Sequence, residues 1–421
     1  MQALIAIPPR QVLQKHGGTE QALMQNVAGV PLLVRVVATA MRAGADSAVV
    51  IWPEDVDPAI WDRCAASRLL IGFKMTKFVC PIIFSPQSAA SWAAIGDELE
   101  ATFLWLPWNW VTHKRALAGL SPEAAPPLTW PLAWECPALI EKRVLYEAKI
   151  RLMPARQVDG VPINSRMDIG RAERFLIANS GKPSDGIYSR FNRFLCRPAV
   201  RLLTHTRVTP NWVTIGGLAV AILAALMFAR GSYANYVAGA LLFFLSGLFD
   251  EMDGMLARTK FAESAFGTMF ESFVDNTTYL LIFSGITAGL YRQRGSRELI
   301  YGLALLTGCL ISIIVTEFQR KSATAAGRPN EYAGRMNRMW EADSSNWISW
   351  IVRQVHVFIK KGIAIHWLLI FTLASGLPLF LRIAALGSNL TWVLALYFSR
   401  RFFKRQDVPD VPGTEAIEDA A

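Results

Sequence analysis

The chain has 421 residues, of which 52% are hydrophobic and 18% charged, and its formal net charge is +10. A composition this apolar excludes a disordered chain or a nucleic-acid-binding arm, because both of these are hydrophilic. Excess apolar residues together with excess positive charge favour a membrane protein. The five cysteines show no CxxC spacing, which argues against a zinc ribbon or a disulfide framework.

The first part of the chain, residues 1–180, predicts an α/β domain. Strand-length apolar runs at residues 3–7, 48–52 and 102–106 alternate with helical stretches such as residues 32–43. This alternation is typical of a largely parallel sheet. The N-terminal residues lack the basic segment of a signal peptide, so we expect this domain to stay in the cytosol.

The next segment, residues 181–208, predicts an amphipathic juxtamembrane helix. Phe191, Phe194 and Leu195 lie there among Arg190 and Arg193. Such a mixture is typical of a helix that lies on an anionic membrane surface. A basic linker is the alternative.

Residues 209–405 predict an all-α domain that crosses the membrane six times, because its apolar stretches reach or approach the ~20 residues that span a bilayer. The candidate spans are residues 210–229, 233–257, 266–290, 298–318, 363–381 and 383–399. If both termini are cytoplasmic, most basic residues of this half face the cytoplasm, as expected for a multi-pass protein of the cell membrane. The acidic tail, residues 406–421, predicts disorder.

Four carboxylates lie where spans should be apolar. Asp250 and Asp253 are three residues apart near the end of the second span, and Glu271 and Asp275 are four apart near the start of the third. Residues at these spacings share a helix face. Converging carboxylates repel one another, so the pattern predicts a divalent cation, and all-oxygen ligation favours Mg²⁺ or Mn²⁺. Helix capping, or pairing of these acids with Arg258, is the alternative.

These acids belong to a longer motif. Residues 250–275 read Asp-x2-Asp-Gly-x2-Ala-Arg-x8-Gly-x3-Glu-x3-Asp, and residues 210–214 read Pro-Asn-x2-Thr. Both strings resemble the signature of the CDP-alcohol phosphotransferases (CDP-alcohol phosphatidyltransferases), which are membrane enzymes with six spans. The resemblance implies transfer of a phospho-alcohol group from a CDP-linked donor to an acceptor hydroxyl, with release of CMP, in phospholipid or phosphodiester-lipid biosynthesis. It also implies a homodimer and two divalent ions.

The resemblance assigns roles by position. Asp250, Asp253, Glu271 and Asp275 would bind metal, and Asp275 would also deprotonate the acceptor hydroxyl. The cytidine diphosphate site would be lined by Asn211, Thr214, Gly254, Ala257 and Arg258. The third acid of the family is normally Asp, and here it is Glu271. The extra methylene group of Glu271 would change the geometry of metal binding, but it would not change the class of reaction.

Further strings, at residues 182–186, 189–193 and 260–264, resemble members that carry a fused nucleotidyltransferase domain and make inositol-phosphate diesters. That branch implies a CDP-polyol donor and a phospho-polyol acceptor, whereas CDP-diacylglycerol and a simple alcohol are the commoner pair. Candidate substrate contacts are Ser189, Arg190, Arg193, Lys260 and Gly267. Binding of membrane lipid headgroups by these cations is the alternative.

The front domain resembles the nucleotidyltransferase partner only in part. Residues 27–35 and 168–173 fit such a domain, but Pro8 and Pro9 stand where the active family has a Gly-rich loop. Proline has no N–H to offer a phosphate, and residues 106–110 lack the expected metal-binding Asp. We interpret the domain as degenerate. A bifunctional enzyme that also makes the CDP-alcohol from CTP is one alternative, and a non-catalytic membrane scaffold is the other.

Overall fold

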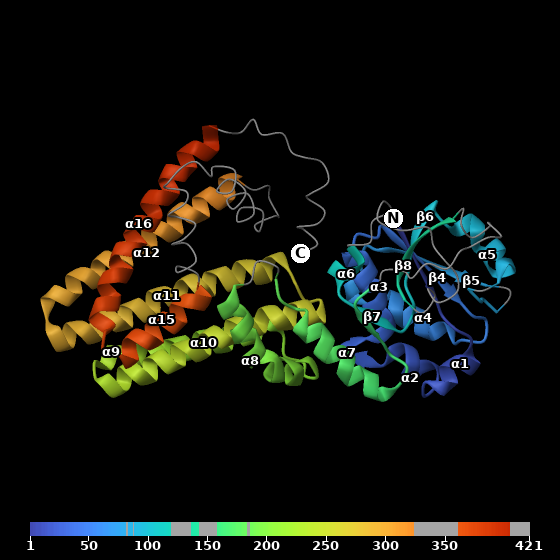
Figure 1. Cartoon of the computed structure of the whole chain (residues 1–421), viewed down its shortest axis with the longest axis horizontal. Coiled ribbons are helices and arrows are strands. Elements are labelled where there is room, and N and C mark those ends of the chain that lie inside the picture. Colours follow the sequence, from blue (N-terminus) through green and yellow to red (C-terminus); the bar gives the residue numbers. More distant parts are fainter. Residues whose placement is uncertain are drawn as a thin grey trace.

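The computed structural model describes residues 1–80, 83–86, 88–118, 136–142, 158–182, 186–323 and 361–404. An α/β domain and a domain of long helices lie side by side along the chain's longest axis (Figure 1). Between them run α7 (Arg166–Ala178) and α8 (Ile187–Thr204). The tail predicted to be disordered, residues 406–421, lies outside the described residues, as do residues 183–185 of the branch motif.

The front domain is built on a five-stranded sheet with the order β5-β4-β1-β6-β8. The four strands β1, β4, β5 and β6 pair in parallel, and β8 pairs antiparallel to β6 at one edge. This confirms the α/β prediction. The strands are β1 (Gln2–Ala6), β4 (Ser47–Trp52), β5 (Lys74–Val79), β6 (Thr102–Trp105) and β8 (Ala138–Glu141).

Smaller elements complete the front domain. Its helices are α1 (Arg10–Lys15), α2 (Thr19–Met24), α3 (Leu32–Arg42), α4 (Pro58–Ala65), α5 (Ala89–Ile95) and α6 (Lys114–Ala118). Two short antiparallel ribbons pair β2 (Asn26–Val27) with β3 (Val30–Pro31), and β7 (Trp110–Thr112) with β9 (Gly160–Pro162).

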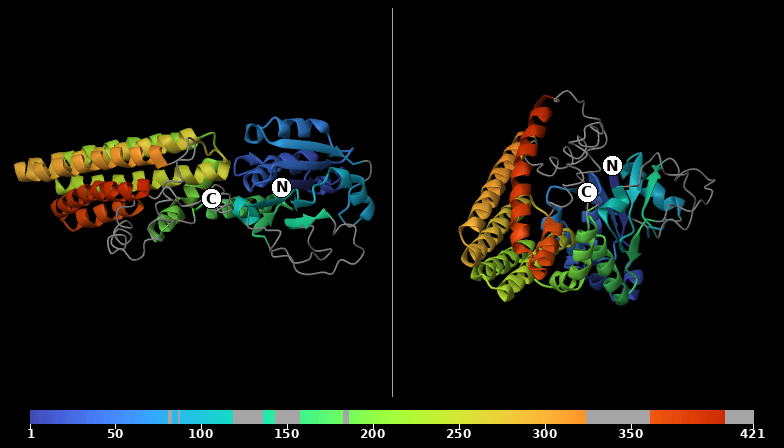
Figure 2. Two further views of the ribbon diagram at one scale, coloured as in Figure 1. Left: turned by 90° about the horizontal axis from the view of Figure 1, so that it is seen from above. Right: turned by 60° about the vertical axis from the view of Figure 1, so that its left-hand side comes forward.

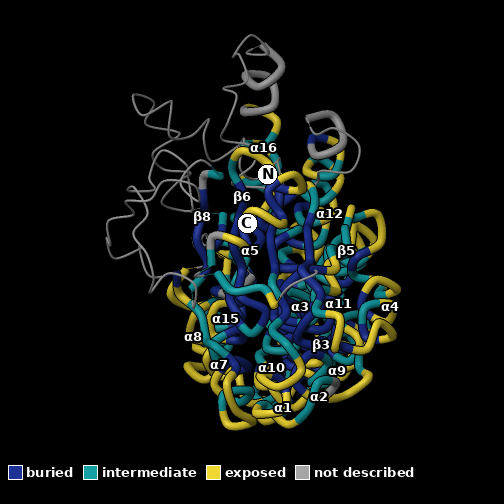
Figure 3. The backbone as a smooth tube through the Cα atoms, turned by 90° about the vertical axis from the view of Figure 1, so that its right-hand side faces the viewer, coloured by how far each residue is buried: buried dark blue, intermediate teal, exposed yellow. Residues whose placement is uncertain are grey.

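Both faces of the inner strands β1, β4 and β6 are buried, which explains why these strands are continuous apolar runs. At the edge of the sheet, β5 is only half-buried. Along β1, Ile5 joins a core cluster with residues of α3, whereas its neighbour Leu4 joins a second cluster with Trp92 of α5. Successive side chains of a strand point to opposite faces, so helices on each side cover alternate residues. Figure 3 shows these strands as a buried layer.

The helical domain consists of long helices that pack lengthwise, as the view from above shows (Figure 2). They are α9 (Pro210–Arg230), α10 (Tyr233–Lys260), α11 (Ala265–Arg294), α12 (Ser296–Ala323), α15 (Lys361–Leu373) and α16 (Leu377–Lys404). Among the described residues, three helical stretches are long and apolar enough to cross a membrane: Pro210–Arg230, Ser296–Gln319 and Leu377–Tyr397. The shorter stretch Ile363–Leu373 is also apolar. The prediction of a membrane protein is therefore supported.

The break between the last two helices differs from the prediction of a boundary near residues 381–383. Helix α15 ends at Leu373, and α16 begins at Leu377. Ser375 adopts a φ of +55°, and the Gly376 N–H donates to the carbonyl of Phe371 at 2.7 Å. This arrangement closes a helix C-terminus, and a proline, Pro378, fits the first turn that follows. Local backbone geometry, which hydropathy does not register, therefore sets the boundary.

Helix α8 forms inside the segment predicted to be amphipathic. Cys196 and Val200 are buried and join a cluster with α10 residues, whereas Phe191 and Phe194 are exposed. One face of α8 is therefore buried against α10 and the other is exposed, and its contact with a membrane surface stays a prediction.

Candidate metal centre

The turn between α10 and α11 brings acidic residues of the two helices close together. Helix α10 ends where Phe261 takes a left-handed conformation with a φ of +56°. Helix α11 begins where the Ser264 hydroxyl accepts from the Gly267 N–H at 3.0 Å. The hairpin brings Asp250, Asp253 and Glu271 together, and one carboxylate oxygen from each lies within 4.8 Å of the others. Glu271 joins this group despite its extra methylene group.

Asp253 is the most buried of these acids, with 3% of its surface exposed. Its Oδ2 accepts a hydrogen bond from the hydroxyl of Thr214 on α9 at 2.5 Å. Its Oδ1 is also buried and has no hydrogen-bond partner among the described residues. A buried carboxylate oxygen without a donor is costly, and a cation would satisfy it. The residues present therefore fit a hard, oxygen-liganded divalent ion.

Asp275 lies one helical turn beyond Glu271 on α11 and is half-buried. It is outside the group of three converging oxygens. Its charge nevertheless acts on Asp253, as the charges of Asp250 and Glu271 do. Its assignment as metal ligand and base stays a prediction.

The residues predicted to line a cytidine diphosphate site fall into two places beside the acids. At the start of α9 and α11, a Cβ on Gly267 would lie 3.6 Å from the Asn211 Oδ1. On α10, a Cβ on Gly254 would lie 3.1 Å from the Arg258 Nη2, and Ala257 is half-buried next to Arg258. The Thr214 hydroxyl donates directly to Asp253, a contact that the sequence did not reveal.

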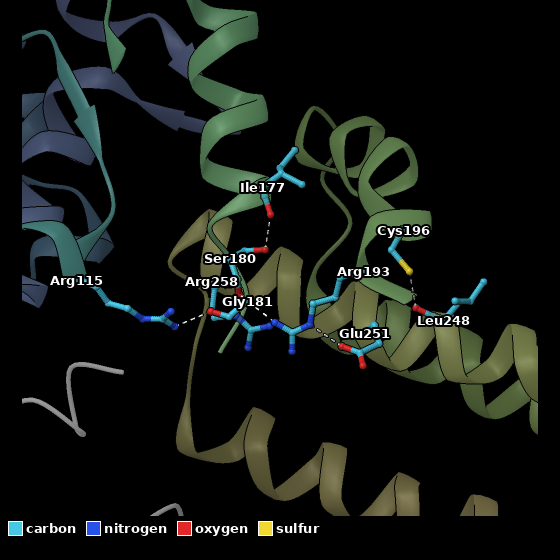
Figure 4. A network of polar contacts seen from close by, with 9 residues as sticks. All are labelled: Arg115, Ile177, Ser180, Gly181, Arg193, Cys196, Leu248, Glu251 and Arg258. Carbon is cyan, nitrogen blue, oxygen red and sulfur yellow. Dashed lines mark hydrogen bonds and ion pairs between the residues drawn. The ribbon is translucent and has the colours of Figure 1, made fainter. Parts of the chain in front are cut away.

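The carbonyl of Ser180, between α7 and α8, accepts from two arginines of this region (Figure 4). One is Arg258 through Nε, and the other is Arg193 through Nη1 at 3.4 Å. The Arg193 Nε also pairs with Glu251 at 2.8 Å, and both side chains are only 12% exposed. Arg193, predicted to contact substrate, is thus held beside the acid-bearing turn of α10. Sequence reasoning missed Ser180 because a carbonyl acceptor carries no residue-type signal.

Two other candidate cations differ in placement. The Lys260 ammonium group donates to the carbonyls of Thr206 and Val208 at 2.8 and 3.1 Å, which ties the end of α10 to the turn before α9. Burial lowers the pKa of Lys260. Arg190 is exposed on α8 beside the half-buried Ser189. Substrate contact by these residues stays a prediction.

Comparison with known proteins confirms the family resemblance for the helical half. Residues 207–373, less than half of the chain, match the CDP-alcohol phosphatidyltransferase family. An archaetidylinositol phosphate synthase of Methanothermobacter thermautotrophicus is 33% identical over 132 residues, which cover 30% of this chain and 63% of that protein. A bifunctional IPC transferase and DIPP synthase of Rubrobacter xylanophilus is 28% identical over 174 residues, or 41% of this chain and 38% of that protein.

The chain thus spans less than two thirds of the length of these curated relatives. A crystal structure of Mycobacterium tuberculosis phosphatidylinositol phosphate synthase with CDP-DAG bound shares 20% identity, over 51% of this chain and 93% of that one. Its TM-score is 0.32, which does not establish a shared arrangement of the helices.

Proposed function

We propose that this chain is a metal-dependent membrane phosphotransferase that moves a phospho-alcohol group from a CDP-linked donor to an acceptor hydroxyl and releases CMP. The observation that carries the proposal is the convergence of Asp250, Asp253 and Glu271 inside the segment that matches the family. The unpartnered Oδ1 of Asp253 adds to it, because a buried anionic oxygen calls for a cation.

In this proposal the three converging carboxylates, with Asp275, hold one or two Mg²⁺ or Mn²⁺ ions. When bound, such ions neutralise charge on the phosphoryl oxygens and on the leaving group. Thr214 fixes the Asp253 carboxylate through its hydroxyl. Asp275, which lies outside the cluster of three, is proposed as the base that takes the proton of the acceptor hydroxyl. Asn211, Gly254, Ala257, Arg258 and Gly267 form the walls against which the donor would lie.

The proposal includes a topology. The six helices α9, α10, α11, α12, α15 and α16 would cross the membrane of the cell, with both termini cytoplasmic and the acids at the cytoplasmic face. Three of the stretches meet the length and apolarity of a span by themselves. Helices α10 and α11 carry the acids and would bury them against each other. A homodimer is part of the proposal, as the family resemblance implies.

For the substrates we propose CDP-diacylglycerol or a CDP-linked polyol as donor and a phosphate-bearing polyol of the inositol phosphate class as acceptor. The names of the relatives from Methanothermobacter and Rubrobacter favour such an acceptor. Arg190 and Arg193 are cations on the cytoplasmic side of the acids, and a phosphate monoester is bound best by charge-assisted hydrogen bonds.

Exchange of radiolabelled CMP into CDP-diacylglycerol, in membranes supplied with Mg²⁺ or Mn²⁺, tests the reaction class. We expect exchange by the wild type, loss in Asp275→Asn, and normal exchange in Asp62→Asn, whose exposed carboxylate lies on α4 of the front domain. Adding labelled inositol phosphate then tests the acceptor. Absence of Asp275-dependent exchange with CDP-diacylglycerol and with CDP-polyols would favour a non-catalytic scaffold.

We propose that the front domain is a nucleotidyltransferase-like domain that no longer acts on nucleotides. Helix α1 follows β1 through Ile7, Pro8 and Pro9, so that two of the three connecting residues have no N–H. The name of the Rubrobacter relative favours the alternative of a bifunctional enzyme. Release of pyrophosphate from CTP and a polyol phosphate by the full chain, unaffected by Asp275→Asn, would establish that alternative.

A further inference from the structure

A cavity lies where the front domain meets the cytoplasmic end of α10. The space within it that admits the centre of a water-sized molecule is about 20 Å³, and it opens to solvent. Residues of α3, β7, α6, α7, α10 and the turn after α10 line it together. None of the four acids of the candidate metal centre is among its described lining residues. The cavity is therefore a separate feature that exists only while the two domains are in contact.

Positive charge dominates the wall of this junction cavity. Its charged lining residues are Arg35, Arg42, Lys114, Arg258 and Glu263. Four cations therefore face one carboxylate, and the nearest oxygen of that carboxylate already lies 3.4 Å from Arg42. Cations so close together repel one another unless an anion lies between them.

Arg35 is the strongest indication that the wall suits an anion, although the buried carboxylate of Glu173 already acts on it. The residue is 1% exposed, on the apolar helix α3. Its Nε donates to the carbonyl of Val27 at 3.1 Å, and its Nη2 donates to the carbonyl of Thr259, across the junction, at 2.9 Å. Its Nη1 is buried and has no hydrogen-bond partner among the described residues. A buried guanidinium N–H without an acceptor is costly, and an oxyanion in the cavity would provide one.

Lys114 completes the arrangement from the opposite wall. Its ammonium group makes no hydrogen bond to the described part of the chain, and Glu263 is the only acid among the charged groups that act on it. Burial, followed by Arg42, Arg115 and Arg258, lowers its pKa. Burial likewise lowers the pKa of Arg35, to about 9, which leaves this guanidinium cationic at neutral pH.

We propose that the junction cavity binds a phosphate group, held by Arg35 and Arg42 of the front domain, Lys114 of the same domain and Arg258 of α10. Several N–H donors around one small site match the acceptor oxygens of a phosphate monoester. The phosphate belongs either to a free anion or to the headgroup of an anionic lipid such as phosphatidic acid, because the cavity lies at the end of a helix proposed to span the membrane. Arg258 is shared with the proposed donor site, whereas Arg35, Arg42 and Lys114 belong to the junction cavity alone.

Equilibrium dialysis of the full chain in detergent against radiolabelled inorganic phosphate tests the proposal. EDTA is present throughout, so that no metal at the carboxylates can bind the probe. We expect saturable binding of about one phosphate per chain. Lys114→Gln should weaken it by roughly tenfold or more, as expected for loss of a charge-assisted contact. Lys74→Gln, at the exposed start of β5, is the matched control and should bind as the wild type does.

Binding that is absent, or equal in the wild type and Lys114→Gln, would overturn the site. Arg42→Gln is a second variant with the same expectation, and its folding is checked by circular dichroism because Arg42 also contacts Glu263. Nanodiscs separate the two sources of phosphate. If a lipid headgroup occupies the site, phosphatidic acid discs block binding of inorganic phosphate and phosphatidylcholine discs do not. If the ligand is a free anion, both kinds of disc leave binding intact. CMP exchange measured in parallel shows whether the metal centre works independently of this site.

Discussion

The front domain and the helical domain differ in the kind of side chain that they bury where a ligand could bind. In a parallel sheet, ligands bind at the carboxyl ends of the strands. Here those ends lead into Pro8 and Pro9 after β1, and into Leu106 and Trp108 after β6, both of which are buried. In the helical domain the corresponding enclosed position holds Asp253 with an unpartnered oxygen. The sheet edge of the front domain therefore buries apolar side chains, whereas the helical domain buries a charged carboxylate.

This difference shows where chemistry is to be sought. A protein retains a buried, unsatisfied polar atom only where something offsets its cost. The buried side chains of Leu106 and Trp108 leave the end of β6 without a charged group for a phosphate, which agrees with the proposal that the front domain no longer acts on nucleotides. The same reasoning applies to the junction cavity, where Arg35 has a buried N–H without a partner among the described residues.

The sharpest test of the comparison is Asp253→Asn. The amide has nearly the shape of the carboxylate, so that the helices should pack unchanged while one metal-binding charge is lost. We expect exchange of CMP to fall by roughly a thousandfold, in the range seen when an electrostatic group of an active site is removed. An unchanged rate would show that the buried charge serves the fold rather than a reaction.

A smaller loss is expected for Thr214→Val, which removes the hydroxyl that donates to Asp253. Groups that orient a metal ligand typically contribute 10–100-fold to metal affinity or activity. We expect a loss in that range, with the greater part appearing as a raised Mn²⁺ requirement. Thr277→Val is the control, because the Thr277 hydroxyl donates only to a carbonyl of its own helix, that of Phe273, at 2.8 Å. Equal effects of both variants would contradict the orienting role.

Contact between the two domains can be broken by one methyl group. Gly29 has a φ of +81°, and a Cβ there would lie 2.6 Å from the carbonyl of Thr204 at the end of α8. Gly29→Ala combines this clash with backbone strain, and we expect a loss of about 2–3 kcal/mol in the free energy of unfolding.

Gly44→Ala separates the two effects. Gly44 has a φ of +97° with open space around its Cβ position, so strain alone should cost about 1 kcal/mol. Denaturant titration of both variants, followed by circular dichroism, gives the free energy of unfolding of each. The difference between the two values measures the contribution of the contact with Thr204. If Gly44→Ala is as unstable as Gly29→Ala, the contact with Thr204 contributes nothing.

The smallest expected effect concerns pH. Burial, followed by the charges of Arg115, Lys114 and Arg258, lowers the pKa of His113 to about 4 from its ordinary value of 6.5. Between these values the unfolded chain binds a proton that the folded chain does not, so stability falls as the pH drops from 6.5 towards 4. Because the side chain is partly exposed, we expect less than about 1 kcal/mol between pH 7 and pH 5.5. His113→Asn should reduce this slope in thermal melts, whereas His16→Asn should keep it.

How much the sequence predicts depends on whether side chains or backbone atoms carry the feature. The α/β alternation of the front domain and the facing acids of α10 and α11 are side-chain patterns at fixed spacing, and the structure has both. The end of α15 depends on backbone angles at Ser375 and Gly376, and the wrong boundary at residues 381–383 followed from hydropathy alone. Arg35 did leave a signal, a lone cation within the apolar run of residues 32–38.

The contacts at the junction between the domains affect how far sequence comparison of relatives could detect it. Arg35, Arg42, Arg115 and Arg258 each donate to a main-chain oxygen, those of Thr259, Phe261, Gly181 and Ser180 respectively. Every residue type offers the same carbonyl, so substitutions on the accepting side leave the acceptor in place. Paired substitutions, which usually reveal spatial contact between distant positions, would therefore be confined to the few side-chain pairs at this junction, Arg42 with Glu263 and Glu173 with Arg201 and His205. Relatives could share the docked arrangement while their sequences show little coupling between the two domains.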